Sequence, residues 1–316
     1  MVRLRKKKKD ANCTKGQPRM PGTFGCDTNR TIWVSGSCEG LFQCGDGSQT
    51  RCAGSTRCVC SVRPAECRVN PRDHPPVAQQ WAKPIVVVPA VYDEWRRGRP
   101  PWACPDVSQN YMVCPLYQRL DRAAARYVPN HGYEAGVYLR FVLDYYERLP
   151  ELIVFLQADA DSILSHSVAN MINRFDLAQF RAKRVSFLPL IQARSLRNRS
   201  VDNWESVPHV EECWRNILDW FGRSEVFPKS QTPTVTFYPG NYFAVTREAI
   251  LRYPHATWHR VYERLIVNNS CTGFGTDPAL GKHHAAGAFE HLAHVIWGGH
   301  AATYAGPHWT MSQWGR

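Results

Sequence analysis

The chain has 316 residues, of which 44% are hydrophobic and 12% are aromatic, so it can form a large core and is not an intrinsically disordered sequence. The formal net charge is +12, but six positive charges lie in Arg3–Lys9, a run typical of a solvated tail or of the flank of a membrane segment. No nucleic-acid-binding motif accompanies this run, and no apolar stretch approaches the roughly 20 residues of a membrane helix. We therefore expect neither nucleic-acid binding nor a membrane span within this chain.

Residues 1–12 are predicted to be a basic tail without the apolar core of a secretory signal, so that a signal or membrane anchor would lie outside this sequence. Residues 13–67 contain eight of the twelve cysteines and no Cys-x-x-Cys pair, which favours disulfides over a zinc site and leaves their pairing open. Four N-glycosylation sequons begin at Asn12, Asn29, Asn198 and Asn268. These features predict a disulfide-rich module and a location in the lumen of the ER or Golgi, or outside the cell.

A Pro-rich linker is predicted over residues 68–82, followed by one α/β domain over residues 83–316. Buried strands are expected at Pro84–Val91 and Leu152–Gln157, because both are continuous apolar runs. Between them, apolar side chains at every fourth position predict a helix over Glu134–Leu149 that Pro150 ends. The remaining periodic segments predict a strand at Val185–Ile191 and helices at Ser165–Phe175, Cys213–Phe221, Trp258–Val267 and Ala285–Trp297.

Alternating strands and helices predict a mostly parallel sheet with helices on both faces, similar to the GT-A and Rossmann architectures. Thr234–Val245 is expected to be two strands separated by Gly240 and Asn241, with a helix beginning at Thr246. Glycine at the end of a strand allows a ligand to approach the backbone closely, so Gly240 and Asn241 are candidate substrate-binding residues. Arg247 could bind a phosphate or carboxylate, or could form a structural ion pair.

Two acidic residues, Asp159 and Asp161, follow the strand that ends at Gln157. Ligands of open α/β sheets bind at the carboxyl ends of the strands, and two such carboxylates can hold Mn²⁺ or Mg²⁺ on a diphosphate. Gln157 is a further candidate for substrate binding. The alternative is that one aspartate caps the next helix and the other is solvated.

Other candidates come from the last third of the chain. Glu290 is expected to be a catalytic base or to orient an acceptor, and Asp277 competes for that role. His300 and His308 are candidate ligands of the same metal, whereas His166 is a candidate substrate contact or an ordinary helix residue. Cys104 with Cys114, and Cys213 with Cys271, are the expected disulfides of this domain.

Five blocks in order resemble domain-of-unknown-function family 3431: PNHGYE (129–134), YLRFVLDYYERLP (138–150), VFLQAD (154–159), FAVTREAI (243–250) and FEHLAHVIWG (289–298). The resemblance covers residues 84–305 and implies a shared fold and cleft, but no assigned reaction. It also implies that an aspartate and a later histidine follow the Phe-Leu-Gln strand, here Asp159 or Asp161 and His166. Separately, IWVSGSCEGLFQC (32–44) resembles a small extracellular Cys-rich module.

From these features we expect a metal-dependent, GT-A-like glycosyltransferase that uses a nucleotide sugar and a glycan or glycoprotein acceptor in the secretory pathway. One alternative is a non-catalytic extracellular carbohydrate-binding protein. Another is a hydrolase of polysaccharides or esters, for which the sequence has carboxylates but no diagnostic spacing.

Overall fold

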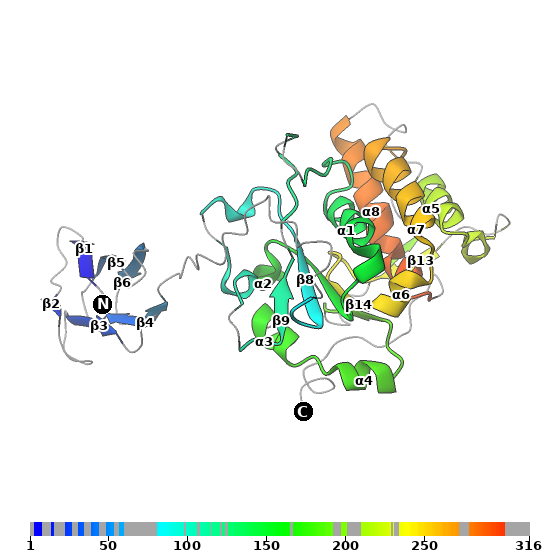
Figure 1. The fold of residues 1–316 in the computed structure, drawn as a ribbon. Helices are drawn as coiled ribbons and strands as arrows, with labels where there is room; N and C mark the ends of the chain where they lie inside the picture. Colours follow the sequence, from blue (N-terminus) through cyan, green and yellow to red (C-terminus); the bar gives the residue numbers. More distant parts are fainter. Residues whose placement is uncertain are drawn as a thin grey trace. The chain divides into compact units, whose positions relative to one another are not determined.

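The computed structural model describes most of residues 81–300 (Figure 1). The described ranges are 81–97, 99–105, 108–114, 116–120, 122–123, 126–164, 167–191, 210–228, 230, 234–271 and 278–300, with side chains from 285 in the last range. Of residues 1–80 and 197–200, only the strands are described. Contacts divide the chain into two compact units, Met1–Val69 and Asn70–Arg316.

The first unit contains two small sheets. β1 (Arg3–Lys7), β5 (Glu39–Gln43) and β6 (Gln49–Ala53) form one sheet, and the other has the order β2 (Thr14–Lys15), β3 (Thr23–Cys26), β4 (Thr31–Val34), β7 (Arg57–Val59). β1 pairs antiparallel with β5, which differs from the solvated tail predicted for this run. The side chains of the eight cysteines lie outside the described residues, so the disulfide-rich module stays a prediction.

The second unit is built on a five-stranded sheet in the order β11 (Phe187–Pro189), β14 (Phe243–Thr246), β10 (Leu152–Gln157), β8 (Ile85–Ala90), β9 (Tyr111–Val113). β10, β8 and β9 are parallel, whereas β14 runs antiparallel to both of its neighbours. The prediction of a mostly parallel sheet in a mixed α/β domain is therefore confirmed. A separate pair, β12 (Arg197–Ser200) and β13 (Thr234–Phe237), is antiparallel.

Both faces of the large sheet are covered, as the apolar strands require. Ile153 and Phe155 of β10 belong to one buried cluster, and Leu152, Val154 and Leu156 belong to the cluster on the opposite face. Because side chains alternate along a strand, this division shows that β10 is buried on both sides. The continuous apolar run over Leu152–Gln157 thus has the physical cause that the sequence indicated.

The helices form two unequal layers (Figure 1). The larger layer contains α1 (Glu134–Tyr145), α5 (Val210–Trp220), α6 (Arg247–Leu251), α7 (His255–Tyr262) and α8 (Pro278–Ile296). The opposite layer contains α2 (Ala160–Ile163), α3 (Val168–Asn173) and α4 (Leu177–Ala182). α7 continues as a π-helix over Glu263–Val267. Within the described part of the chain, no helix is long and apolar enough to cross a bilayer.

Stacked aromatic rings join the larger helical layer to the sheet. Trp297, just after α8, stacks on Trp258 of α7 with ring centroids 4.7 Å apart, and also contacts Phe155 and Phe243 of the sheet at 5.3 and 5.7 Å. Trp258, Trp297, Phe155 and Phe243 are all at most 1% exposed. This packing fixes the position of α8 against the strands.

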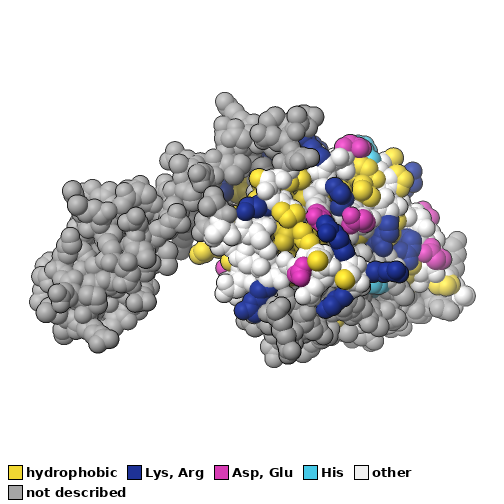
Figure 2. All heavy atoms as spheres, turned by 60° about the horizontal axis from the view of Figure 1, so that its bottom comes forward, with side chains coloured by type: hydrophobic (Ala, Val, Ile, Leu, Met, Phe, Trp, Pro, Cys, Tyr) yellow, Lys and Arg dark blue, Asp and Glu magenta, His cyan; other side chains and the backbone are white. Residues whose placement is uncertain are grey.

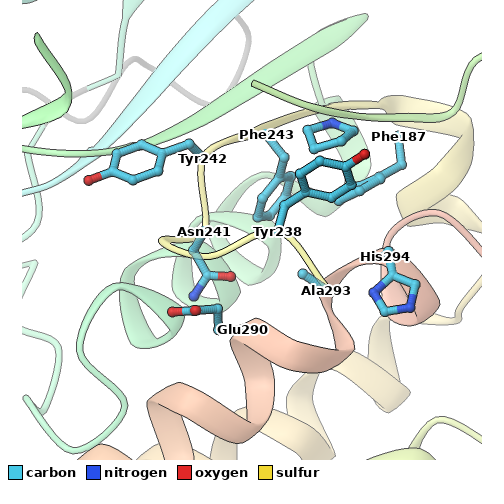
Figure 3. Close-up of a pocket in the computed structure, with 9 residues that line it drawn as sticks. Phe187, Tyr238, Asn241, Tyr242, Phe243, Glu290, Ala293 and His294 are labelled. Carbon is cyan, nitrogen blue, oxygen red and sulfur yellow. The ribbon is translucent and has the colours of Figure 1, made fainter. Parts of the chain in front are cut away.

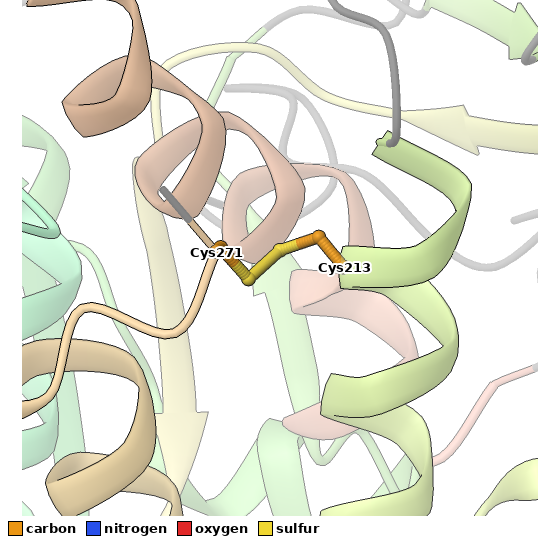
Figure 4. Close-up of a disulfide and its surroundings, with 2 residues drawn as sticks. All are labelled: Cys213 and Cys271. Atoms are coloured by element: carbon orange, nitrogen blue, oxygen red, sulfur yellow. A yellow bond between two sulfur atoms is a disulfide. The ribbon is translucent and has the colours of Figure 1, made fainter. Parts of the chain in front are cut away.

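A disulfide joins Cys213 of α5 to Cys271, which follows the π-helix, with Cα atoms 5.5 Å apart (Figure 4). This predicted pair is confirmed. The predicted pair of Cys104 with Cys114 is wrong, because Cys104 is disulfide-bonded whereas Cys114 remains a thiol. Cys114 is 1% exposed in the core cluster that includes Tyr117 and Tyr145, and its burial raises the pKa of the thiol. Cys114, which the sequence predicted to be disulfide-bonded, is thus a core residue.

Candidate functional site

Polar residues gather where β10 ends and β14 begins. Phe155 of β10 lies opposite Phe243 of β14, and the two strands run in opposite directions. The residues after Phe155 and the residues before Phe243 therefore lie at the same edge of the sheet. In this way Gln157 and Asp159 come close to Gly240, Asn241 and Tyr242, although more than 80 residues separate the two segments.

The turn before β14 is held in an unusual backbone conformation. Gly240 has φ +95° and Asn241 has φ +54°. A Cβ atom at Gly240 would lie 2.3 Å from the ring of Tyr242, so this position requires glycine. The side chain of Gln157 donates a hydrogen bond to the carbonyl oxygen of Gly240 at 2.8 Å, and Tyr138 donates from its hydroxyl to the carbonyl oxygen of Asn241 at 3.3 Å. The turn is thus tied to both β10 and α1.

Asn241 connects this turn to a carboxyl group at the start of α1. Its Nδ2 donates to Oε1 of Glu134 at 2.9 Å, and the residue is only 2% exposed. Burial raises the pKa of Glu134, and the hydrogen bond from Asn241 partly opposes that shift. Tyr133, just before Glu134, has φ +46°. Residues with positive φ therefore stand on both sides of this hydrogen bond, and backbone strain of this kind gathers at functional sites.

The hydroxyl group of Tyr242 lies beside the carboxylate of Asp159. The hydroxyl donates toward Oε1 of Gln157 at 3.2 Å and Oδ1 of Asp159 at 3.4 Å. Burial raises the pKa of Tyr242 most, and the charges of Asp159, Glu134 and Glu290 raise it further. Tyr242 is therefore a hydrogen-bond donor at neutral pH, and Glu290, from the distant α8, belongs to the same electrostatic cluster.

The two aspartates after β10 have different environments, although both are exposed. Oδ1 of Asp161 accepts a hydrogen bond from the backbone N–H of Val168, the first residue of α3, at 3.1 Å. Asp159 faces the hydroxyl of Tyr242. The structure thus assigns a helix-anchoring contact to Asp161 and leaves Asp159 as the carboxylate of the polar cluster.

The donor set at this edge limits which metal could bind there. Among the described residues, no three His, Cys, Asp or Glu side chains are arranged to hold a metal ion. The exposed carboxylate of Asp159 suits a hard cation, such as Mn²⁺ or Mg²⁺, whose remaining ligands are water and substrate phosphates. It does not form a protein-only metal centre with the described side chains.

A small pocket adjoins the polar cluster and lies between strands β11 and β14 on one side and helix α8 on the other (Figure 3). Its walls include Phe187, Tyr238 and Phe243, and its polar lining includes Asn241 and Glu290. Figure 3 shows the amide of Asn241 above the carboxylate of Glu290, with the amide oxygen directed toward the side on which Ala293 lies. The remaining lining residues are Pro189, Tyr242, Ala293 and His294.

Several predicted site residues lie elsewhere. Arg247 begins α6 at the opposite edge of the sheet, where its Nη1 contacts the carbonyl oxygen of Leu149 at 3.5 Å. The ring of His300 packs against Phe187, which lies level with Ile153, near the amino end of β10, whereas Asp159 follows its carboxyl end. Burial and the nearby charge of Arg252 lower the pKa of His300. The structure does not bring either residue to the aspartates. His166, Asp277 and His308 lie outside the described residues.

The sequence did not indicate that Glu134, Tyr242 or Arg119 belongs to a site. Arg119 is 8% exposed, donates to the carbonyl oxygen of Val91 at 3.0 Å and to Oδ1 of Asn130 at 3.2 Å, and its charge lowers the pKa of Glu134. The available signal was the block PNHGYE, which places an acid directly after His-Gly-Tyr. An acid in the first turn of a helix is also ordinary, because it interacts favourably with the helix dipole, so the block alone did not indicate a site.

The fold and this site define the protein as an α/β protein with a polar cluster at the carboxyl edge of a mostly parallel sheet. A family model described as "Protein of unknown function (DUF3431)" matches residues 101–311, so the chain belongs to this family. This confirms the resemblance found from the sequence blocks. No curated protein and no solved structure matches the chain.

Proposed function

We propose that the α/β domain is a glycosyltransferase-like enzyme of GT-A type that transfers a sugar from a nucleotide sugar to a glycan or glycoprotein. The proposal rests on one observation: the hydroxyl of Tyr242 lies 3.4 Å from the carboxylate of Asp159 at the carboxyl edge of the sheet, and the charges of Glu134 and Glu290 are near enough to raise the pKa of Tyr242 as well. This edge is where open α/β sheets bind their ligands. Asp159 is the exposed member of the set.

Asp159 is proposed to bind the diphosphate side of the donor through Mn²⁺ or Mg²⁺. A bound cation would supply Lewis-acid stabilisation of the departing diphosphate. Tyr242 is proposed to hold the carboxylate of Asp159 in place, since its hydroxyl lies 3.4 Å from Oδ1 of Asp159 and 3.2 Å from Oε1 of Gln157, and its single proton can bond to either oxygen. The turn at Gly240 and Asn241 then borders the transferred sugar.

Glu290 is proposed to act as the general base. The acceptor hydroxyl oxygen bonds to the anomeric carbon of the donor while the bond from that carbon to the phosphate oxygen breaks. The hydroxyl proton passes to Glu290, and the nucleoside diphosphate leaves with the bonding electrons. Glu134 acts as a positioning residue, because its hydrogen bond with Asn241 fixes the amide that lies beside Glu290.

We propose the secretory-pathway lumen or the extracellular space as the location. Disulfides persist in oxidising compartments, and the Cys213–Cys271 bond supports this assignment. The sequons agree with it, because their acceptor asparagines are modified in the same pathway.

The test is a thermal-shift and turnover screen of nucleotide sugars with and without Mn²⁺. We expect one donor to raise the melting temperature only when the metal is present, because the site binds a metal–diphosphate complex. Asp159→Asn should reduce metal-dependent turnover by about 100-fold or more, the scale expected for losing one transition-state contact.

The matched control is Asp161→Asn, two residues away and also exposed. An asparagine keeps an oxygen acceptor for the N–H of Val168, so this variant should lose less than about 5-fold in turnover, a small effect for a residue outside the reacting groups. Equal losses in the two variants would contradict the assignment to Asp159. Glycan binding without metal dependence or turnover would instead identify a non-catalytic carbohydrate-binding protein.

A further inference from the structure

Arg119 is a buried cation without an ion pair at the carboxyl edge of the sheet. The residue is 8% exposed. Its Nε donates to the carbonyl oxygen of Val91 at 3.0 Å and its Nη1 to Oδ1 of Asn130 at 3.2 Å, and both acceptors are uncharged. Among the described residues, no carboxylate forms an ion pair with it. Buried charges in proteins are usually paired, so an anion would be stabilised at this guanidinium group.

One nitrogen of Arg119 is open to a ligand. Nη2 makes no hydrogen bond with the described part of the chain. It is also not one of the buried side-chain atoms that lack a partner there, so it is in contact with solvent. The guanidinium group lies 5.4 Å from the centre of the Tyr92 ring, and Tyr92 is 41% exposed. Nε and Nη1 therefore hold the group in place while Nη2 reaches the surface.

The register of the sheet relates Arg119 to Asp159. β8 and β10 are parallel neighbours, about 5 Å apart, and they end level with each other at Ala90 and Gln157. Arg119 binds the carbonyl oxygen of Val91, the first residue after β8, and Asp159 is the second residue after β10. A cation and an exposed carboxylate thus lie just past the ends of two adjacent strands.

A ligand for this edge should carry both signs of charge. Burial lowers the pKa of Arg119, and the charges of Glu134 and Glu94 oppose that shift, so both carboxylates act on the guanidinium group. A simple anion bound to Arg119 would also meet their negative charge and that of Asp159. A metal-bound diphosphate avoids this conflict, because its cation can face a carboxylate while its phosphate oxygens accept from the arginine.

We propose that Arg119 binds a phosphate oxygen of a metal-bound diphosphate whose cation is held by Asp159. The inference rests on the proposed function and adds a second anchor for the diphosphate side of the donor. Arg119 would hold a fixed positive charge beside the diphosphate as negative charge develops on it. The diphosphate is the shared chemistry of nucleotide-linked and lipid-linked sugars, so the test includes both sources.

The test is isothermal titration calorimetry of the full chain with inorganic pyrophosphate and Mg²⁺. We expect Arg119→Gln to weaken binding at least about 10-fold, because a charge-assisted hydrogen bond is lost. Arg119→Lys keeps the charge without the planar fork and should lie between the two. The matched control is Arg126→Gln, also buried at 3% exposed, whose guanidinium contacts Tyr145 at the other end of α1 and should bind within about 3-fold of wild type.

A second pair of variants acts from the surface, because loss of a buried arginine can unfold the protein. Tyr92→Glu places a carboxylate beside the guanidinium group, where it competes with the phosphate, and should weaken binding at least about 10-fold. Tyr92→Gln is similar in size to that variant but uncharged, and should change binding by less than about 3-fold. Circular dichroism verifies that each variant folds.

Two outcomes would overturn the proposal: no binding of Mg²⁺–pyrophosphate by the wild type, or equal binding by the wild type, Tyr92→Glu and folded Arg119→Gln. UDP and geranyl diphosphate then identify the source of the diphosphate. Tighter binding of UDP supports a nucleotide and tighter binding of geranyl diphosphate supports a lipid carrier, and either must depend on Arg119.

These outcomes are distinguishable from those of the donor screen. Pyrophosphate binding that depends on Arg119, without nucleotide-sugar turnover, would retain this site and reject the transferase. Turnover that is unchanged in Arg119→Gln would retain the transferase and reject the role of Arg119.

Discussion

The amino and carboxyl ends of the strands in the large sheet, called here the amino edge and the carboxyl edge, differ in how their polar groups are hydrogen-bonded. At the amino edge of β10, the backbone N–H groups of Leu152, Thr246 and Arg247 donate to carbonyl oxygens at 3.0, 3.0 and 3.1 Å. At the carboxyl edge, Gly240, Asn241 and Tyr133 have positive φ, and Oδ1 of Asn241 has no partner among the described residues. Positive φ also occurs near the amino edge, at Arg184 just before β11 and at Gly299 beside Arg252, so the two edges differ in their polar side chains more than in backbone strain.

Charges follow the same division. At the amino edge, Arg181 pairs with Glu151, and Arg252 donates to the carbonyl oxygens of Trp297 and Gly298 at the end of α8. Figure 2 shows the face that includes this edge, with Lys and Arg side chains lying among Asp and Glu. At the carboxyl edge, Asp159, Glu134 and Glu290 are instead close enough to raise the pKa of Tyr242 together.

The largest expected effect on stability comes from removing the Cys213–Cys271 disulfide, because this bond holds together the helical layer that packs on the sheet. The bond closes a loop with a sequence separation of 58 residues. Cys213→Ala with Cys271→Ala should lower the free energy of unfolding by about 4 kcal/mol, because the unfolded chain regains the entropy of that loop. Chemical denaturation measures the change. A loss below about 1 kcal/mol would show that packing of α5 alone holds this layer.

A smaller loss is expected at the amino edge from Arg252→Ala. Its guanidinium group donates to Ala249 and Gly298 at 3.2 and 3.0 Å and to Trp297, and a cation at the carboxyl end of α8 also interacts favourably with the helix dipole. We expect about 1–2 kcal/mol of destabilisation by thermal or urea unfolding, with little change in ligand binding at the carboxyl edge.

Arg247→Ala is the matched control for Arg252. Both arginines are exposed, Arg247 as the first residue of α6 and Arg252 as its C-cap, but the only described side-chain contact of Arg247 is the 3.5 Å approach of Nη1 to the carbonyl oxygen of Leu149. This variant should change stability by less than about 0.5 kcal/mol, as is usual for surface substitutions. A larger loss of stability in Arg247→Ala than in Arg252→Ala would contradict the assignment of a structural role to Arg252 and not to Arg247.

Much of the fold was predictable because burial on both faces leaves a direct mark on the sequence. The strand predicted over Leu152–Gln157 has the bounds of β10, and Glu134 begins α1 as predicted. Thr246 caps α6 and accepts from the N–H of Ala249 at 3.4 Å, as its position before Arg-Glu indicated. The short strand β9 was missed because its three residues, Tyr111–Val113, are too few to show a period.

The site was predicted only in part. Four of the predicted residues lie in or beside the polar cluster: Gln157, Asp159, Asn241 and Glu290. Strand ends and turns indicated the first three, since ligands of open α/β sheets bind there. The direction of β14 is what brings Tyr242 to Asp159, and an apolar run does not indicate direction. Likewise, the choice of Asp161 as helix anchor depends on where α3 begins, which became visible only in three dimensions.

The finest test of the comparison is Glu134→Gln, which should stabilise the protein at neutral pH. Burial raises the pKa of Glu134 above its ordinary value of 4.5, so the folded state binds this proton more tightly than the unfolded state. The stability from this group is fully present below pH 4.5 and is lost as the pH rises through the folded-state pKa. The neutral amide avoids that loss and still offers an oxygen to Nδ2 of Asn241.

We expect Glu134→Gln to unfold with nearly the wild-type free energy at pH 4, and to be more stable than wild type by up to about 1 kcal/mol at pH 7.5, at the expense of ligand binding or turnover. Urea unfolding at the two pH values measures the difference. Equal destabilisation at both values would mean that the Glu134–Asn241 bond is an ordinary structural contact. The contrast with the amino edge would then rest on the polar side chains of Asp159 and Tyr242 alone.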